Sequence, residues 1–221
     1  ETLCENGYSL TTPPFLMNRE AYEGVVDLTD FEEVMYKIED HDLYLIATSE
    51  HPITARFKNE IIELKDGPLK FAGISTNFRR EVGAHGISDR GIWRVHQFSK
   101  VEQVIICKPE DSKEMHNEIL ENATHIFKKL EIPFRVIDIC TGDIGTVAAR
   151  KFDIEAWMPS SKKWKEVVSA SNCKSYQSVR LNMRYRTQEG TDFPHTLNST
   201  AVATTRLSLI HISEPTRHNS I

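Results

Sequence analysis

Two strand-like stretches separated by a polar loop constrain the fold of this chain more than any other feature. Residues 71–83 and 93–108 carry β-branched and aromatic side chains in the alternating order that is typical of strands. The loop between them, "GAHGISDRG", is polar and contains three glycines. Two such strands joined by a loop of this kind predict a long antiparallel hairpin.

The rest of the chain contains more strand patterns than helix patterns. The clearest helix spans residues 111–132, where Asp111 and Glu114 form a capping-box pattern and apolar residues recur on one face. A second helix is expected to begin near Ile53, after a strand and a turn at residues 50–52. Further strands are expected at residues 134–139, 151–159 and 163–171. Because hairpins outnumber crossovers, the pattern predicts an α+β fold with an antiparallel sheet flanked by helices.

The composition is that of an ordinary globular domain. The 221 residues are 39% hydrophobic and 27% charged, and no apolar run is long enough to cross a membrane. The formal net charge of -5 gives no general reason to expect nucleic-acid binding, so any RNA contact should be local or lie on a part of the protein outside this chain. The chain has no signal-peptide pattern and no initiator methionine, so the natural start is expected further upstream. The widely spaced cysteines are expected to be reduced, buried thiols: Cys4, Cys107, Cys140 and Cys173.

The densest group of candidate functional side chains lies on the predicted hairpin. It comprises Arg79, Arg80, Glu81, Arg90, Arg94, His96, Phe98 and Glu102. If the second strand is regular, Arg94, His96 and Phe98 share one face. Guanidinium groups bind phosphates, an aromatic ring stacks on a base and a carboxylate binds an amine, so this group could hold a nucleotide. A solvated, charged hairpin face explains the same residues equally well.

A second candidate site lies near the end of the strand expected at residues 163–171. The side chains of Glu166 and Ser169 offer the oxygen ligands that Mg²⁺ prefers. On a regular strand two residues three apart face opposite sides, so joint action requires a bulge between them. The alternative is one exposed glutamate and one ordinary serine. Residues 140–145, "CTGDIG", predict a tight turn, because they lack the longer pattern of a phosphate-binding loop.

In this order the segments resemble the class II aminoacyl-tRNA synthetases and, within that class, the seryl-tRNA synthetases. The resemblance rests on "GYSLTTPP", "TSE", "FRREVGAHGISDRGIWRVHQFSKVEQ", "TGDIG", "KEVVSASN" and "TLNSTAVATTR". The combination of "RVHQFSKVEQ" with "TGDIG" is far more specific than any single motif. It covers residues 1–206 and implies the class II catalytic core, an antiparallel sheet flanked by helices, truncated at both ends.

The resemblance also implies a site for ATP, serine and Mg²⁺. Arg79 would bind the α-phosphate, Arg206 the γ-phosphate, and Phe98 would stack on adenine. The implied catalytic residues are Arg79, Glu81, Arg94 and Arg206. The implied ATP-binding residues are Arg79, Arg80, Glu81, Val95, Phe98, Glu166, Val167, Val168, Ser169 and Arg206. The implied serine-binding residues are Thr48, Ser49, Glu50, Glu102, Asn198 and Thr200. Mg²⁺ would be held, with ATP, by Glu166 and Ser169.

The implied activity is that of a serine–tRNA ligase, which activates L-serine with ATP and transfers it to tRNA(Ser). The family setting is a cytoplasmic homodimer with no membrane contact and no structural zinc. An N-terminal arm, absent from this chain, would bind most of the tRNA, so the 221-residue piece itself is expected to have little or no activity. An alternative is a related ligase that lacks the arm and loads an amino acid onto a carrier protein. A non-enzymatic regulator is disfavoured, because such relatives typically lose motif arginines that are kept here.

The last fifteen residues depart from the family pattern. Residues 207–217, "LSLIHISEPTR", resemble the translation of a transposon-end sequencing adapter over eleven consecutive positions. We therefore expect residues 1–206 to form the class II core and residues 207–221 to be adapter-derived. On this interpretation Arg206 lacks the helix that should follow it, and any structure in the tail should pack poorly. The alternative is a native final strand, because "LSLIHI" also alternates.

Overall fold

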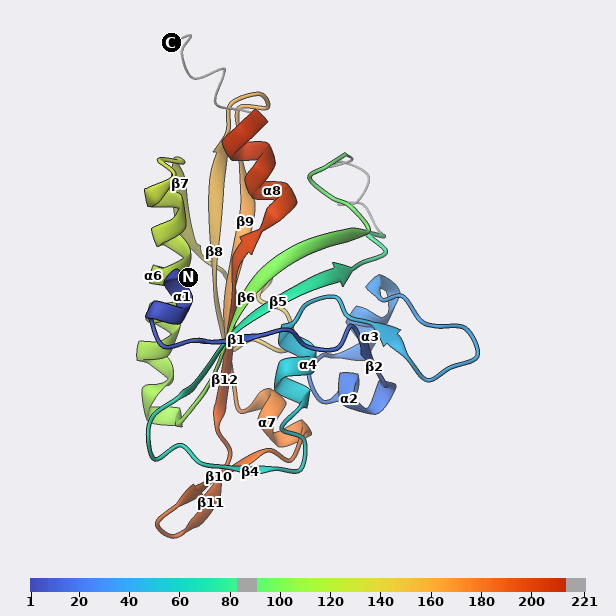
Figure 1. Cartoon of the computed structure of the whole chain (residues 1–221), viewed down its shortest axis with the longest axis vertical. Coiled ribbons are helices and arrows are strands. Elements are labelled where there is room, and N and C mark those ends of the chain that lie inside the picture. Colours follow the sequence, from blue (N-terminus) through green and yellow to red (C-terminus); the bar gives the residue numbers. More distant parts are fainter. Residues whose placement is uncertain (83–90, 214–221) are drawn as a thin grey trace.

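In the computed structural model, a seven-stranded sheet runs along the molecule and carries helices on both faces (Figure 1). The structure describes residues 1–82 and 91–213. The strand order is β1-β5-β6-β12-β9-β8-β7, and β1 with β5 is the parallel pair among antiparallel ones. The strands are β1 (Ser9–Thr11), β5 (Leu69–Phe78), β6 (Gln97–Cys107), β7 (Phe134–Asp138), β8 (Arg150–Met158), β9 (Lys163–Lys174) and β12 (His195–Ala203). The expected α+β class is confirmed.

The predicted hairpin is formed by β5 and β6, which pair from Leu69 opposite Ile106 to Phe78 opposite Gln97. Both strands are shorter at the loop end than the sequence pattern indicated. The backbone N–H of Arg80 donates to the carbonyl of Val34 instead of to β6, which takes the chain out of the ladder. Arg94 and His96 precede β6, so the regular strand on which their expected alternation depended does not extend to them. Residues 83–90, including Arg90, lie outside the described residues.

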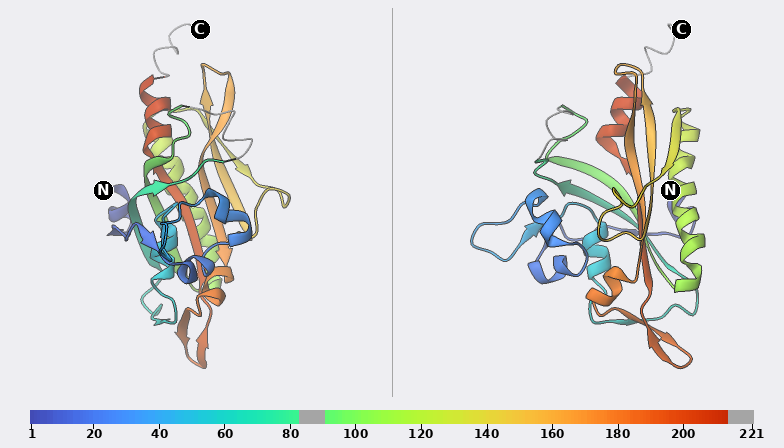
Figure 2. Two further views of the ribbon diagram at one scale, coloured as in Figure 1. Left: turned by 90° about the vertical axis from the view of Figure 1, so that its right-hand side faces the viewer. Right: turned by 180° about the vertical axis from the view of Figure 1, so that it is seen from behind.

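Helix α6 (Ser112–Lys129) covers one face of the sheet with the short α1 (Thr2–Glu5) beside it, and α2 (Arg19–Glu23) and α3 (Leu28–Phe31) lie on the other side (Figures 1 and 2). Its buried residues Met115, Ile119, Ala123 and Phe127 pack on apolar side chains of β6, β8, β9 and β12. The capping box predicted at Asp111 is wrong. This residue closes a 3-10 turn, Pro109–Asp111, with helical backbone angles, and its side chain accepts no capping bond.

On the opposite face, α4 (Glu50–Ala55) begins three residues earlier than predicted, with Pro52 in its first turn. It packs unusually close to β5 at Gly73. A Cβ at that glycine would lie 2.5 Å from the Ser49 hydroxyl and 2.7 Å from Ile53 Cδ1. Because Gly73 has no side chain, the start of α4 can lie directly on β5, and its first residue, Glu50, is placed over the sheet.

The remaining elements are short. The helical ones are α1 (Thr2–Glu5), α2 (Arg19–Glu23), α3 (Leu28–Phe31), η1 (Glu32–Val34) and α7 (Tyr176–Arg180). Strands β10 (Arg184–Thr187), β11 (Gly190–Asp192) and β4 (Ile61–Ile62) form a small sheet, and β2 (Leu16–Met17) pairs with β3 (Tyr44–Leu45). Among the residues that the structure describes, no helix has the length and apolar character needed to cross a membrane.

All four cysteines carry free thiols, as expected, but only two of them are buried. Cys107 and Cys173 lie in the interior, whereas Cys4 and Cys140 are exposed. The expectation of four buried thiols is therefore wrong for the two cysteines outside the sheet. Cys4 belongs to the short helix α1, which buries none of its residues, and Cys140 lies on the turn that follows β7.

The segment after Arg206 is helical and packed as far as the structure describes it. Helix α8 (Thr204–Ser208) contains Arg206 and continues into a π-helical turn, Leu209–Ser213. Ile210 is 4% exposed and joins the core cluster under α6, with Leu207 and Leu209 packed against it. The expectation of a poorly packed tail and of an arginine without a helix is therefore wrong for residues 207–213.

Candidate functional site

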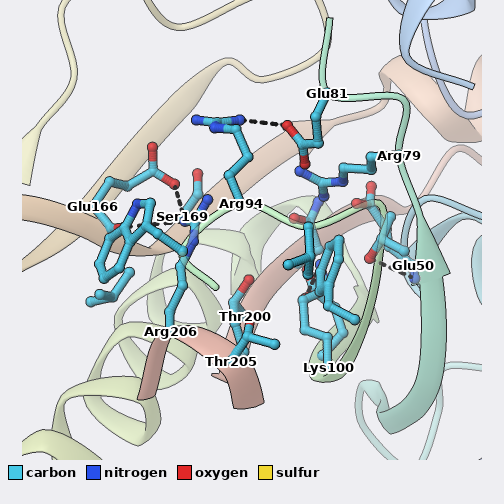
Figure 3. Close-up of a pocket in the computed structure, with 18 of the residues that line it drawn as sticks. Glu50, Arg79, Glu81, Arg94, Lys100, Glu166, Ser169, Thr200, Thr205 and Arg206 are labelled. Carbon is cyan, nitrogen blue, oxygen red and sulfur yellow. Dashed lines mark hydrogen bonds and ion pairs between the residues drawn. The ribbon is translucent and has the colours of Figure 1, made fainter. Parts of the chain in front are cut away.

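A cleft of about 230 Å³ lies on the sheet face opposite α6. Strands β6, β9 and β12 form its floor, and α4, α8 and the segments next to the hairpin loop form its walls (Figure 3). It gathers most of the predicted site residues: Thr48, Glu50, Arg79, Glu81, Arg94, Val95, Phe98, Glu102, Glu166, Val167, Ser169, Asn198, Thr200 and Arg206. Side chains separated by more than 150 residues of sequence thus meet in one cavity.

Three of the residues that the family resemblance implied do not line the cleft. Val168 points through the sheet into the core beneath α6, because strand residues alternate between faces. Ser49 is fully buried, and its hydroxyl donates to the carbonyl of Gly73 at 3.3 Å. Arg80 follows the chain away from the hairpin and borders a separate shallow hollow beside Tyr36.

One end of the cleft is built around Arg206. Its guanidinium donates to the backbone carbonyl of Glu166 at 3.1 Å, and it lies 5.3 Å from the centre of the Trp93 ring. Burial is the main reason that the pKa of Arg206 is lowered. Arginine remains protonated at any physiological pH, so this end of the cleft keeps a desolvated positive charge. Such a charge binds a phosphate more strongly than an exposed one does.

Next to Arg206, a bulge in β9 brings Glu166 and Ser169 to the same face. Ile154 pairs with Val168, but the next residue of β8 pairs with Glu166, so Val167 is the extra residue. The bulge that joint action of these two side chains requires is therefore present. Asp153 lies directly opposite Ser169, and burial, with the charge of Glu166, raises the pKa of its carboxyl to about 6. The result is a group of oxygen donors suited to a hard divalent cation.

Two further arginines enter the cleft from the segments that flank the hairpin loop. Arg94 forms an ion pair of 2.6 Å with Glu81, and both side chains are largely buried (Figure 3). Arg79 donates from Nε to the carbonyl of Ala47 at 3.3 Å, and its guanidinium lies 5.4 Å from the centre of the Phe98 ring. Each guanidinium is thus held by an oxygen contact, with nitrogens left over for a ligand.

The other end of the cleft holds two carboxylates. Glu102, on the floor, forms a 2.7 Å ion pair with Lys100. Glu50, at the start of α4, accepts a hydrogen bond of 2.9 Å from the amide of Gln177. Burial, and then the charge of Glu102, raises the pKa of Glu50 to about 7. Burial lowers the pKa of Lys100. An ammonium ligand placed here would satisfy carboxylates that have little access to water.

Sequence reasoning missed several residues that line the cleft. These are Phe31, His51, Trp93, Lys100, Ala203 and Thr205. Lys100 could have been found, because it alternates with Phe98 and Glu102 and therefore faces the same side of β6. The others approach through tertiary packing and leave no local signal. His96 was included in the candidate group, but its ring lies outside the cleft and hydrogen-bonds the hydroxyl of Tyr36.

Comparisons with known proteins agree with this arrangement. The family model for the class II tRNA synthetase core domain (G, H, P, S and T) matches residues 33–214. A serine–tRNA ligase from Methanospirillum hungatei is 60% identical over 209 residues, which are 93% of this chain and 49% of that protein. The chain thus spans about half the length of the curated relatives it matches.

Two solved structures are similar over nearly the whole chain. Seryl-tRNA synthetase from Pyrococcus horikoshii complexed with ATP is 51% identical, with a TM-score of 0.92 over 96% of this chain and 48% of that one. The cytoplasmic serine–tRNA ligase of Naegleria fowleri in complex with AMP is 42% identical, with a TM-score of 0.88 over 96% of this chain and 51% of that one. With the matching family model, they show that the chain belongs to the class II tRNA synthetase core domain family.

Proposed function

We propose that the protein containing this chain is a serine–tRNA ligase, which activates L-serine with ATP and transfers the seryl group to tRNA(Ser). One observation carries the proposal: a single cleft holds Arg79 and Arg206 together with the buried carboxylates Glu50 and Glu102. Arginines bind a triphosphate, and paired carboxylates bind an amino acid's ammonium group. The names of the similar proteins support serine as that amino acid.

In the first step, the carboxylate of serine attacks the α-phosphorus of ATP and pyrophosphate leaves. Little proton transfer is required, so the protein contributes position and positive charge. Arg79 lies between the two ends of the cleft and is assigned to the α-phosphate, whereas Arg206 is assigned to the γ-phosphate. Phe98 would stack on the adenine ring. Because these charges are partly desolvated before ATP arrives, they stabilise the transition state without reorganising.

The bulged segment of β9 fits a magnesium ion that accompanies ATP. Glu166 and Ser169 share a face there and supply oxygen donors, and Asp153 stands opposite Ser169. We assign the ion to Glu166 and Ser169. When bound, Mg²⁺ would neutralise negative charge on the phosphates.

Selection of serine is assigned to the carboxylate end of the cleft. Thr200 pairs directly with Glu102 across β12 and β6, so a hydroxyl and a carboxylate face the same point. An amino acid without the serine hydroxyl would leave these buried groups unpaired, which is costly. Thr48 and Asn198 complete the assigned serine pocket. Threonine would have to be excluded by the size of the pocket.

The wider setting is also part of the proposal. The core would work in the cytoplasm as a homodimer, and an N-terminal arm would bind the body of the tRNA. No structural zinc is assigned. The fact that the chain spans about half the length of its relatives leaves room for such an arm in the whole protein.

Serine-dependent exchange of pyrophosphate into ATP by the full-length protein tests the proposal. Arg79→Ala should lower the rate about 100-fold or more, in line with the loss of one preorganised charge at the reacting phosphate. Arg56→Ala is a matched control, because this arginine is exposed at the end of α4 and does not line the cleft. Equal rates for the two variants, or exchange that does not depend on serine, would contradict the assignment.

A further inference from the structure

Asp153 is a buried acidic residue that has no assigned part in the proposed mechanism. It lies on β8 directly opposite Ser169, on the sheet face that carries the cleft, but it does not border the cleft itself. The residue is 8% exposed, and its Oδ1 atom has no hydrogen-bond partner among the described residues. Buried polar atoms normally have partners, so a carboxylate in this position requires an explanation.

The packing of the fold does not account for a charge at Asp153. Burial, and then the charge of Glu166, disfavours the ionised form of its carboxyl group and raises the pKa to about 6. Lys151 is the nearby cation on the same strand, but its ammonium donates to the backbone carbonyl of Asp143 at 3.0 Å. A buried charge without a counter-ion lowers the stability of a fold. The benefit of this carboxylate should therefore lie in the site and not in the packing.

Ser169 is the site residue on which Asp153 can act. The bulge at Val167 puts Ser169 beside Glu166 at the Arg206 end of the cleft (Figure 3). Hydrogen bonding by the Ser169 side chain partly offsets the rise in the pKa of Asp153, so the two side chains lie within reach of each other. Asp153 thus meets Ser169 from outside the cleft.

A serine hydroxyl binds a cation well only when its proton points away from the ion. The group has one proton to donate and two lone pairs that can accept or ligate. A carboxylate has acceptors alone, so Asp153 would take the proton and leave the lone pairs of Ser169 to the ion. Outer partners of metal ligands commonly orient them in this way.

We propose that Asp153 is a positioning residue, which holds the Ser169 hydroxyl in the orientation that binds the magnesium ion of ATP. This inference rests on the proposed function, because it requires the ion assigned to Glu166 and Ser169. Asp153 itself contacts neither ATP nor serine and acts only through Ser169. The fold then tolerates a buried carboxylate because the carboxylate improves a ligand in the cleft.

Binding of Mn²⁺, which accepts the same oxygen ligands as Mg²⁺, tests the proposal. Electron paramagnetic resonance measures free Mn²⁺ in mixtures of the full-length protein with a non-hydrolysable ATP analogue, at a mildly alkaline pH that keeps Asp153 ionised. Asp153→Asn should weaken Mn²⁺ binding about tenfold or more, because losing an outer partner typically costs about 10–100-fold in metal affinity. The amide is a weaker acceptor, and it can donate to the serine oxygen that should face the ion.

A double variant tests whether Asp153 acts through Ser169. Ser169→Ala should also weaken Mn²⁺ binding. Adding Asp153→Asn to Ser169→Ala should cause no further loss, because the hydroxyl that Asp153 orients is already absent. A plain effect of charge on the ion would instead persist in the Ser169→Ala background.

Two controls separate this role from a structural one and from long-range charge. Urea unfolding should show Asp153→Asn to be at least as stable as the parent, because the variant removes a buried charge that lacks a counter-ion. Glu155→Gln is the matched control for charge. Glu155 lies on the same strand opposite Glu166 and pairs with Arg135 at 2.6 Å. This variant should change the Mn²⁺ affinity by less than about twofold, because a partly exposed, paired carboxylate contributes little.

The outcomes distinguish this proposal from the proposed function. Additive losses in the double variant would overturn the role of Asp153, and so would an unchanged Mn²⁺ affinity in Asp153→Asn. A loss of stability that parallels the loss of affinity would overturn it as well. Serine-dependent pyrophosphate exchange by the parent protein tests the proposed function separately. If exchange occurs and the Mn²⁺ results differ from those expected, only the role of Asp153 is refuted.

Discussion

The buried ion pair between Lys100 and Glu102 makes the sharpest prediction about stability. The ammonium and carboxylate are 2.7 Å apart, and the two side chains are 7% and 3% exposed. Replacing Lys100 with methionine keeps most of the side-chain volume but leaves Glu102 buried without its counter-charge. Removing one partner of a buried pair typically costs about 3–5 kcal/mol, so the free energy of unfolding should fall by roughly that amount.

Urea unfolding of the full-length protein, at one fixed protein concentration, measures this loss of stability. Removing both charges, in Lys100→Met with Glu102→Gln, should restore much of the stability, because no uncompensated charge remains. The pair of Lys70 and Glu118 is a control: its separation is also 2.7 Å, but its side chains are 18% and 26% exposed. Lys70→Met should cost about 1 kcal/mol or less. If the two single losses at Lys100 and Glu102 simply add in the double variant, the explanation by charge compensation is refuted.

Three further predictions concern the pH dependence of stability, the packing of α4 and the end of the chain. Because the pKa of Glu50 is raised to about 7, the folded state holds this proton more tightly than the unfolded chain does. The free energy of unfolding should therefore fall by about 3 kcal/mol between pH 4.5 and 7. Urea titrations of Glu50→Gln across this pH range should lack that fall. If the variant keeps the same pH dependence as the parent, Glu50 is not its cause. Gly73→Ala should lower the free energy of unfolding by about 1–3 kcal/mol through overpacking, and the melting temperature should fall with it. Gly142→Ala is the control and should leave the melting temperature unchanged, because its new Cβ meets no atom within 4 Å. Resequencing the gene from a different library should give other codons after Arg206, and the same codons would show that the tail is native.

The fold could be predicted from the sequence largely because its main elements are locally encoded. The hairpin of β5 and β6 and the helix α6 each carry a strong hydrophobic period, and both form where the period indicates. Element ends were less accurate. Arg80 leaves the ladder because its N–H bonds to the carbonyl of Val34, a long-range contact that no local pattern reports.

The candidate site was predicted from motif resemblance more than from local chemistry. Alternation along β6 places Phe98 and Glu102 on one face. The same alternation places Lys100 on that face, so it could also have predicted this third cleft residue. His51 carries no such signal, because the position of α4 and the packing of the Tyr22 and Phe31 rings place it at the cleft. The packed turn after Arg206 was not predicted, because the resemblance of residues 207–217 to an adapter placed them outside the expected fold. Leu207 and Ile210, three residues apart, share one face of that turn.

The bulge at Val167 makes a local break in strand pairing, and not only residue identity, a requirement of the candidate metal site. Glu166 and Ser169 are three residues apart, so they share a face only because Val167 is left out of the ladder. If this segment paired as a regular ladder with all its residues, Glu166 would turn to the far side of the sheet. Relatives that use these two side chains together at this spacing should therefore keep the bulge, whichever side chain stands at its position.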